Sequence, residues 1–152
     1  MSVQPQNIPL ASSHTADERT MAALAHGSAL LDLFAGVGGL IAALVIWLTQ
    51  REKSAWVAQH ALQALVFQAS VLVVTVLVVG VVWVFGFIIS FATIGIGTII
   101  AVPVMILAFF GGFAMVAAGM CYSLYAAYQI YQGREFTYVI TGKWFQNHRA
   151  VA

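Results

Sequence analysis

The feature that most constrains this chain is a run of 80 residues, 54–133, that contains no Asp, Glu, Lys or Arg. One helical crossing of a bilayer needs about 20 apolar residues, so this run has room for at least two crossings. Over the whole chain 62% of the residues are hydrophobic and 7% are charged, where about a quarter is usual for charged residues in a soluble domain. So few charges cannot cover a water-exposed exterior. The sequence therefore predicts an all-α integral membrane protein.

The uncharged run divides near its middle, at Ser90–Thr98, where two glycines permit turn geometry that other residues resist. This break leaves two apolar segments of nearly equal length, about Ala55–Ile89 and about Thr98–Gln132. We expect them to form a long uncharged helical hairpin over 55–132.

The first apolar segment, Ala22–Gln50, contains three closely spaced glycines, Gly36, Gly38 and Gly39. It is either one long helix with a soft centre or a broken pair of helices over about 16–34 and 37–50. We favour the broken pair, because glycine destabilises the interior of a lone straight helix. The membrane domain then has three to four transmembrane or re-entrant helices.

Basic residues predict the orientation, because the cytoplasmic flanks of membrane proteins carry an excess of Lys and Arg. Both interpretations place the Arg51–Lys53 loop and the C-terminus in the cytoplasm, and they differ only in the side of the N-terminus. Residues 1–15 lack the apolar stretch of a cleavable signal. We expect a multi-pass protein of the bacterial inner (cytoplasmic) membrane. Its parts are a mobile polar tail over 1–15, a single helical membrane domain over 16–132, and a cytoplasmic or interfacial tail over 133–152.

Small residues recur at steps of four and seven along the second half of the hairpin. They are Ala108, Gly112, Gly119, Ser123 and Ala126. Such spacing keeps them on one helix face and lets another helix approach closely. This small-residue seam either packs inside the hairpin or forms a docking face for another subunit.

Asp32 is the one charged residue inside the first apolar segment. A carboxylate within a membrane span is costly and is usually paired or functional. We predict an interfacial or hydrogen-bonded role for it, and we count it with the seam among the candidate helix-packing or interface residues.

His26 and His60 are weak candidates for binding haem or a pigment, since two histidines on separate helices can ligate a haem. Each also neighbours polar groups that can satisfy it. We predict no cofactor and no metal site, although lipids are expected ligands of a membrane protein. The sequence contains no Ser-His-Asp set, carboxylate pair or phosphate-binding loop, so we expect no enzyme. With a net charge of +1, no nucleic-acid partner is expected.

Several stretches, 18–26, 46–54, 57–68 and 133–138, resemble the Tic-twenty-like family of small bacterial membrane proteins, a domain of unknown function. The residues that carry the motif are His26, Arg51, Glu52, Lys53, Ser54, His60, Gln63, Phe67 and Gln68. The resemblance implies a small helical inner-membrane protein, and it implies no catalytic residue. It also suggests a distant likeness to a component of a chloroplast import channel.

Three functional hypotheses follow. The first is an accessory or scaffold subunit that packs against a larger membrane complex, such as a respiratory or photosynthetic one. The second is an oligomeric translocation or transport conduit, which depends on the family resemblance. The third is haem or pigment binding through His26 or His60. The expected partners are lipids and either other membrane-protein subunits or further copies of the chain.

Overall fold

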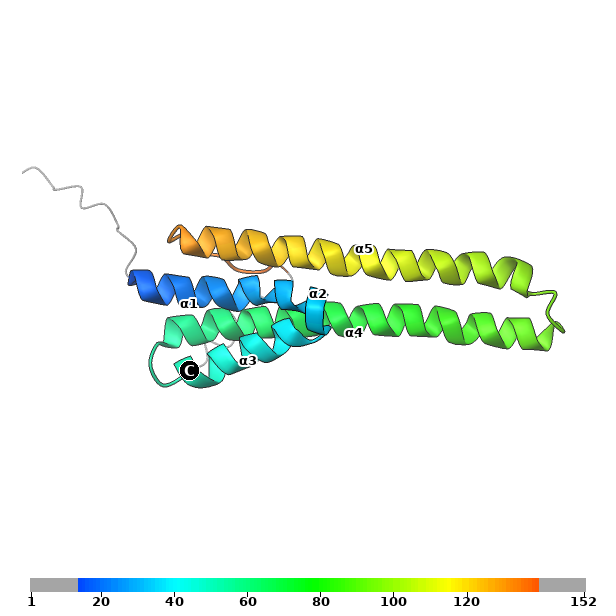
Figure 1. The fold of residues 1–152 in the computed structure, drawn as a ribbon, viewed down its shortest axis with the longest axis horizontal. Coiled ribbons are helices and arrows are strands. Elements are labelled where there is room, and N and C mark those ends of the chain that lie inside the picture. The colour runs from blue at the N-terminus through cyan, green and yellow to red at the C-terminus, as the bar shows by residue number, and fades with distance from the viewer. Residues whose placement is uncertain (1–13, 140–152) are drawn as a thin grey trace, which may run out of the picture.

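The computed structural model describes residues 14–139, and this part of the chain is helical, without strands (Figure 1). The expected tail over 1–15 and most of the tail over 133–152 lie outside the described residues. In chain order the elements are α1 (Ala16–Gly27), a 3₁₀ turn (Ser28–Leu31), α2 (Asp32–Ala35), α3 (Gly38–Gln50), α4 (Ala55–Ala92) and α5 (Thr98–Tyr131). The all-helical fold predicted from the sequence is confirmed.

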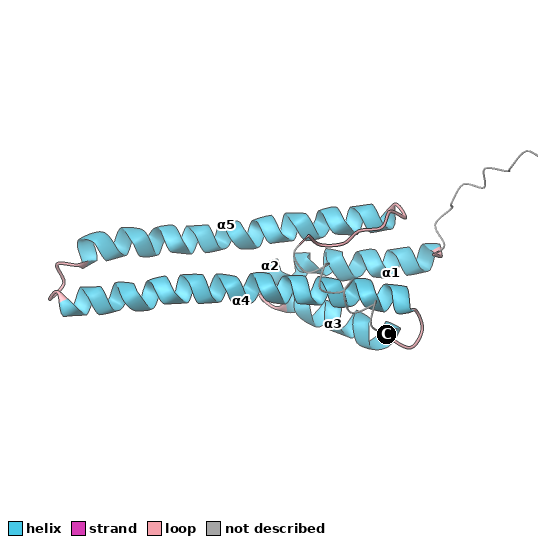
Figure 2. Cartoon of the chain, turned by 180° about the vertical axis from the view of Figure 1, so that it is seen from behind, coloured by secondary structure: helices cyan, strands magenta, loops and turns pink. Residues whose placement is uncertain are grey.

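The two long helices, α4 and α5, lie side by side and antiparallel as the expected hairpin (Figures 1 and 2). Ser54 caps the start of α4 by accepting the backbone N–H of Val57 at 3.4 Å. After Ala92 the chain turns through a short loop, in which Gly95 has a φ of +87° and its N–H donates to the Ser90 carbonyl at 2.8 Å. A positive φ of this size suits glycine, so the turn falls where the glycines predicted it.

The first apolar segment is a broken pair, as expected. Gly36, with a φ of +66°, reverses the chain after α2, and α3 then runs back along the beginning of α4 (Figure 1). Helices α1 and α3 have 12 and 13 residues. At about 1.5 Å per residue each is about 20 Å long, too short to cross a hydrocarbon core of about 30 Å.

This reversal brings the beginning of α1 to the same end of the molecule as the loop before α4. The Ser54 hydroxyl donates to Glu18 Oε1 at 2.6 Å, and this hydrogen bond lowers the pKa of Glu18. The Trp56 indole N–H donates to Glu135 Oε1 at 3.3 Å and so ties in the segment after α5. Apart from Asp32, the charged residues of 14–139 therefore gather at one end, which we call the charged end.

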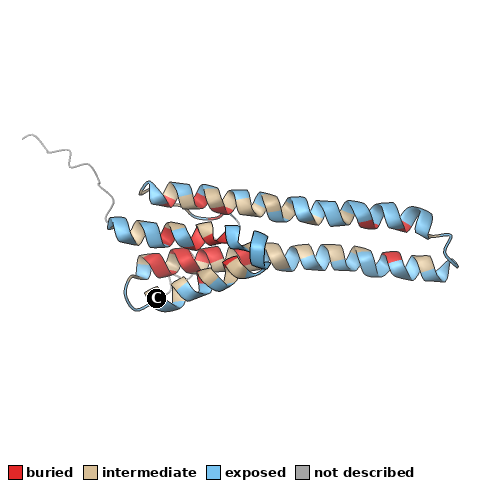
Figure 3. Ribbon diagram, in the orientation of Figure 1, coloured by how far each residue is buried: buried red, intermediate tan, exposed pale blue. Residues whose placement is uncertain are grey.

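Burial is uneven along the bundle (Figure 3). At the charged end α1, α3, α4 and α5 pack around alanines, of which Ala25, Ala43, Ala61 and Ala64 form the core. Alanine lets helices approach closely. The other half consists of α4 and α5 alone, and we call it the free hairpin. Most of its large apolar side chains are exposed, and both helices are long and apolar enough to cross a membrane.

Candidate functional site

The segment after α5 folds back into the charged end and buries Tyr138. Gly133, with a φ of +78°, turns the chain, and the Arg134 N–H donates to the Gln129 carbonyl at 3.0 Å. The Tyr138 side chain is 1% exposed, and its ring stacks on Phe67 with ring centroids 4.1 Å apart. Residues 133–139 therefore form part of the helical bundle.

The Tyr138 hydroxyl joins α1 to α5. It lies 2.8 Å from His26 Nδ1 and 3.1 Å from Ser123 Oγ, and all three side chains are buried. Burial raises the pKa of Tyr138, whose hydroxyl therefore stays protonated. Burial, with His60 nearby, lowers the pKa of His26 to about 3, so its imidazole is neutral. This arrangement is a neutral hydrogen-bonded tie between distant segments of the chain.

The His26 and His60 rings contact each other, and each also contacts an aromatic side chain. Their rings meet edge to face with centroids 5.8 Å apart, and the His60 ring also contacts Trp56. Within 14–139 no group of three or more His, Cys, Asp or Glu side chains could hold a metal ion. The structure thus brings His26 and His60 together as packing partners in the polar end of the bundle.

Asp32 stabilises the corner where the chain reverses. Its Oδ1 accepts the backbone N–H of Gly39 at 2.7 Å, at the start of α3. This bond satisfies a helix N-terminal donor and places negative charge where the helix dipole favours it. A Cβ at Gly39 would lie 2.6 Å from the Ser28 carbonyl oxygen, so the close approach requires glycine.

The small-residue seam faces α4. A Cβ added at Gly112 would lie 2.7 Å from Val79 Cγ2, and one at Gly119 would lie 3.2 Å from Val71. Ser123 and Ala126 are fully buried, and Ala108 is half-buried. Of the two roles considered for the seam, packing inside the hairpin is the one these contacts favour.

The residues of the predicted motif serve the local fold. Arg51, Glu52 and Lys53 form an exposed turn, and Ser54 is the helix cap. Gln63 and Gln68 are buried between helices, and Phe67 lies under Tyr138. These are requirements of a turn between two packed helices.

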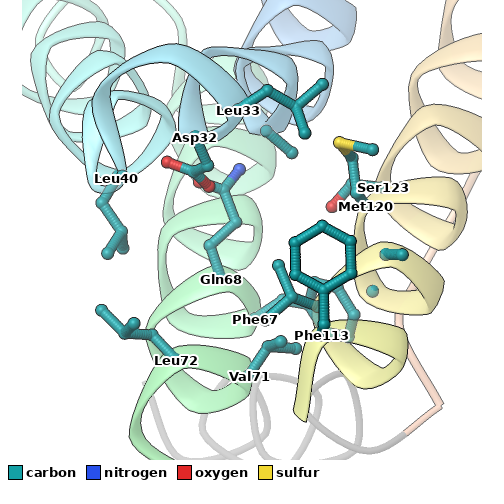
Figure 4. A pocket seen from close by; sticks show the side chains of 15 residues that line it. Asp32, Leu33, Leu40, Phe67, Gln68, Val71, Leu72, Phe113, Met120 and Ser123 are labelled. Carbon is teal, nitrogen blue, oxygen red and sulfur yellow. The ribbon is translucent and has the colours of Figure 1, made fainter. Parts of the chain in front are cut away.

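A cavity of about 500 Å³ lies beside the buried Gln68, between the α2 corner, α4 and α5 (Figure 4). Asp32, Gln68 and Ser123 are its polar lining residues, and the rest of the wall is apolar. Neither the cavity nor the role of Tyr138 is predicted from the sequence. The available signal was the pair of aromatic residues Phe136 and Tyr138, which follows the last helix within a polar stretch.

Comparison with known proteins corrects the family assignment. No curated protein and no solved structure matches the chain. A family model does match residues 17–145, and it describes the MamF/MmsF magnetosome magnetite crystal formation protein family. The Tic-twenty-like resemblance is therefore wrong, and the conduit hypothesis that depended on it loses its support. Because the match covers most of its length, the chain belongs to the magnetosome magnetite crystal formation protein family.

Proposed function

We propose that this chain is a non-catalytic protein of the magnetosome membrane that supports magnetite crystal formation as an accessory or scaffold subunit. The family supplies the process, and it replaces the respiratory or photosynthetic complex considered from the sequence. The structural observation that carries the proposal is the free hairpin, whose exposed apolar surface needs lipid or protein around it (Figure 3).

The lengths of α4 and α5 in the free hairpin match the thickness of one bilayer. From Val71 to Ala92 α4 rises about 33 Å, and α5 rises a similar distance from Thr98 to Met120. These distances match a hydrocarbon core of about 30 Å. The free hairpin alone can therefore fill the bilayer, with the charged end on the cytoplasmic side where Lys and Arg accumulate.

A second apolar surface supports a protein partner. On α2 and α3, Phe34 is 88% exposed, and Ile41 and Val45 are more than half exposed. These residues lie on the half of the molecule that is left outside the bilayer when the free hairpin fills it. Exposed apolar surface of this kind is typical of an interaction site. We infer that another membrane protein covers it.

The opposite end of the hairpin supports an indirect role in crystal growth. The loop Thr93–Gly97 would face the magnetosome lumen, and the chain has no carboxylate between Glu52 and Glu135. Iron in minerals and in proteins is held well by oxygen anions, and this loop offers only hydroxyl and backbone oxygens. The proposed action is therefore on membrane partners and not by coordinating iron at the loop.

Fractionation tests the proposal. In a magnetosome-forming bacterium that carries this chain, purified magnetosomes are washed with sodium carbonate and then solubilised in mild detergent. We expect the chain to resist carbonate, to dissolve in detergent, and to migrate on native gels with other magnetosome membrane proteins. Release by carbonate, or migration as a lone monomer, would contradict the proposal.

A further inference from the structure

The cavity beside the α2 corner has a polar end at Asp32 and Gln68, and the rest of its wall is apolar apart from Ser123 on α5 (Figure 4). Leu40, Val71, Leu72 and Phe113 are among the wall residues, and Phe113 is 68% exposed, so the cavity is continuous with the apolar outside of the hairpin. Its volume of about 500 Å³ lies in the usual range for small-molecule sites.

Gln68 provides an unused acceptor at the polar end. Its side chain is 6% exposed, and Nε2 is directed to Ser28 Oγ at 3.5 Å. Its Oε1 accepts no hydrogen bond from any residue in 14–139. A buried amide oxygen without a donor is unfavourable. Because Oε1 is closed off from solvent, the Gln68 side chain must turn toward the cavity before a bound group can donate to it.

Asp32 provides the charge at the same end. Ser28 links Asp32 to Gln68. Its hydroxyl accepts from Gln68 Nε2 and donates to the Gly39 carbonyl. The Gly39 N–H in turn donates to Asp32 Oδ1. The half-buried carboxylate of Asp32 forms no ion pair within the described part of the chain. An unpaired carboxylate beside an unused amide oxygen suits a cation that can also donate a hydrogen bond.

The depth of this polar end matches a lipid headgroup. Gln68 precedes the end of α4 at Ala92 by about 36 Å of helix, slightly more than the hydrocarbon thickness of about 30 Å. When the free hairpin spans the bilayer, as the proposed function requires, Gln68 and Asp32 lie at headgroup level. The apolar walls then extend from them toward the acyl chains.

We propose that the cavity binds a phospholipid whose headgroup carries a primary ammonium. The ammonium pairs with Asp32 and donates to Gln68 Oε1 once that side chain turns toward it, while one acyl chain lies along Leu72 and Phe113. A quaternary ammonium has no N–H to donate, and a phosphatidylglycerol headgroup has no cation to pair with Asp32 while its phosphate repels that carboxylate. The site therefore selects phosphatidylethanolamine over phosphatidylcholine and phosphatidylglycerol.

Native mass spectrometry of the full chain in mild-detergent micelles tests this selectivity. The three phospholipids, with identical acyl chains, are added at equal mole fraction. We expect the chain to retain phosphatidylethanolamine at least about tenfold more than either of the others, as the loss of one charge-assisted hydrogen bond implies. Equal retention of all three lipids, or retention of none, would overturn the proposal.

Two variants locate the site. Asp32→Asn keeps an acceptor for the Gly39 N–H but removes the charge, and Leu72→Trp fills the apolar part of the cavity. Both should lose the preference, while Glu52→Gln, which removes an exposed loop carboxylate, should keep it. Circular dichroism establishes that each variant is folded. The lipid preference of the wild-type chain is measured first, and that measurement alone can refute the proposal. A variant that fails to fold therefore does not prevent the test.

The assay separates this inference from the proposed function. Lipid selectivity is measured on the isolated chain and does not depend on crystal growth or on partners. If selectivity is present but the chain is released by carbonate, the site stands and the proposed membrane role fails. If the chain resists carbonate but shows no selectivity, the proposed function stands and the site fails.

Discussion

At the scale of single residues, Tyr138 is the side chain on which the folded-back segment depends. Its hydroxyl contacts His26 and Ser123, and neither of those buried groups can reach water. We predict that Tyr138→Phe lowers the free energy of unfolding by about 1–3 kcal/mol, because two buried polar groups lose a partner while the stacking on Phe67 remains.

Chemical unfolding in micelles, followed by circular dichroism, measures this loss. Tyr131→Phe is the matched control, since Tyr131 is 63% exposed and the same change there should have little effect. Equal stability of the Tyr138 variant and the control variant would show that the hydroxyl tie contributes nothing.

The low pKa of His26 predicts a dependence of stability on pH. His26 lies on α1, outside the two long apolar helices, and burial lowers its pKa to about 3. In the unfolded chain a histidine takes up a proton near pH 6.5. Between these two values the unfolded state binds more protons, so stability should fall as the pH drops below about 6.5.

Thermal unfolding at pH values from 7.5 to 5 measures the effect of this histidine. This window avoids Glu18, whose lowered pKa makes its own contribution disappear only under more acidic conditions. His26→Gln, which can still bond to Tyr138, should show a smaller decrease in stability over the same range. An unchanged slope in that variant would exclude His26 as the cause.

At the scale of elements, the corner between α2 and α3 depends on a close backbone approach. A Cβ at Gly39 meets the Ser28 carbonyl oxygen and both oxygens of Asp32 within 3 Å. Backbone cannot yield as a flexible side chain can, so Gly39→Ala should destabilise the fold by about 1–3 kcal/mol. Gly27→Ala, where a Cβ meets nothing within 4 Å, should be neutral or stabilising in the same unfolding experiment. A loss of the same size in both variants would contradict this account of the corner.

The hairpin offers two adjacent glycines with opposite environments. A side chain at Gly112 points into α4 against Val79 and Thr75, whereas a Cβ at Gly111 meets nothing within 4 Å. We predict that Gly112→Leu separates α4 from α5 and lowers the unfolding temperature, while Gly111→Leu leaves the hairpin intact. If Gly111→Leu instead alters migration on native gels without loss of stability, its face of α5 is a contact with another protein. If Gly112→Leu were as stable as the parent, the seam would not pack against α4.

The elements were predictable because their signals are local. The charge-free run, the glycines near Gly95 and the glycines near Gly36 are each visible within a short window, and each gave the correct element. Helix α4 extends three residues past the expected Ile89, because nothing before Gly95 resists helical geometry. The family was not predictable from the motif, since Ser54 and the buried glutamines meet needs that many helical proteins share.

The polar cluster was less predictable because its contacts are long-range. His26 and Tyr138 are separated by 112 positions in the chain. The sequence instead predicts a cytoplasmic or interfacial tail over 133–152. That prediction rests mostly on residues beyond 139, outside the described part of the chain. The sequence predicts an interfacial or hydrogen-bonded role for Asp32 but not its partner. Gly39 is brought to Asp32 by the reversal of the chain at Gly36.

At the scale of the whole molecule, the charged end and the free hairpin divide the protein into two parts with different surroundings. Helix α4 is 38 residues and about 57 Å long, nearly twice the thickness of the hydrocarbon core. One bilayer cannot cover the free hairpin and the apolar faces of α2 and α3 together. A bilayer around the free hairpin therefore leaves the apolar faces of α2 and α3 for the proposed protein partner to cover.

The central claim is that this chain supports magnetite crystal formation from within the magnetosome membrane. The most direct measurement is the distribution of crystal lengths, by electron microscopy, in a magnetosome-forming strain lacking this chain and in the same strain with the chain restored. The account predicts smaller or misshapen crystals without the chain and a return to the parental distribution when it is restored. Identical distributions in the parental strain, the strain lacking the chain and the restored strain would contradict it.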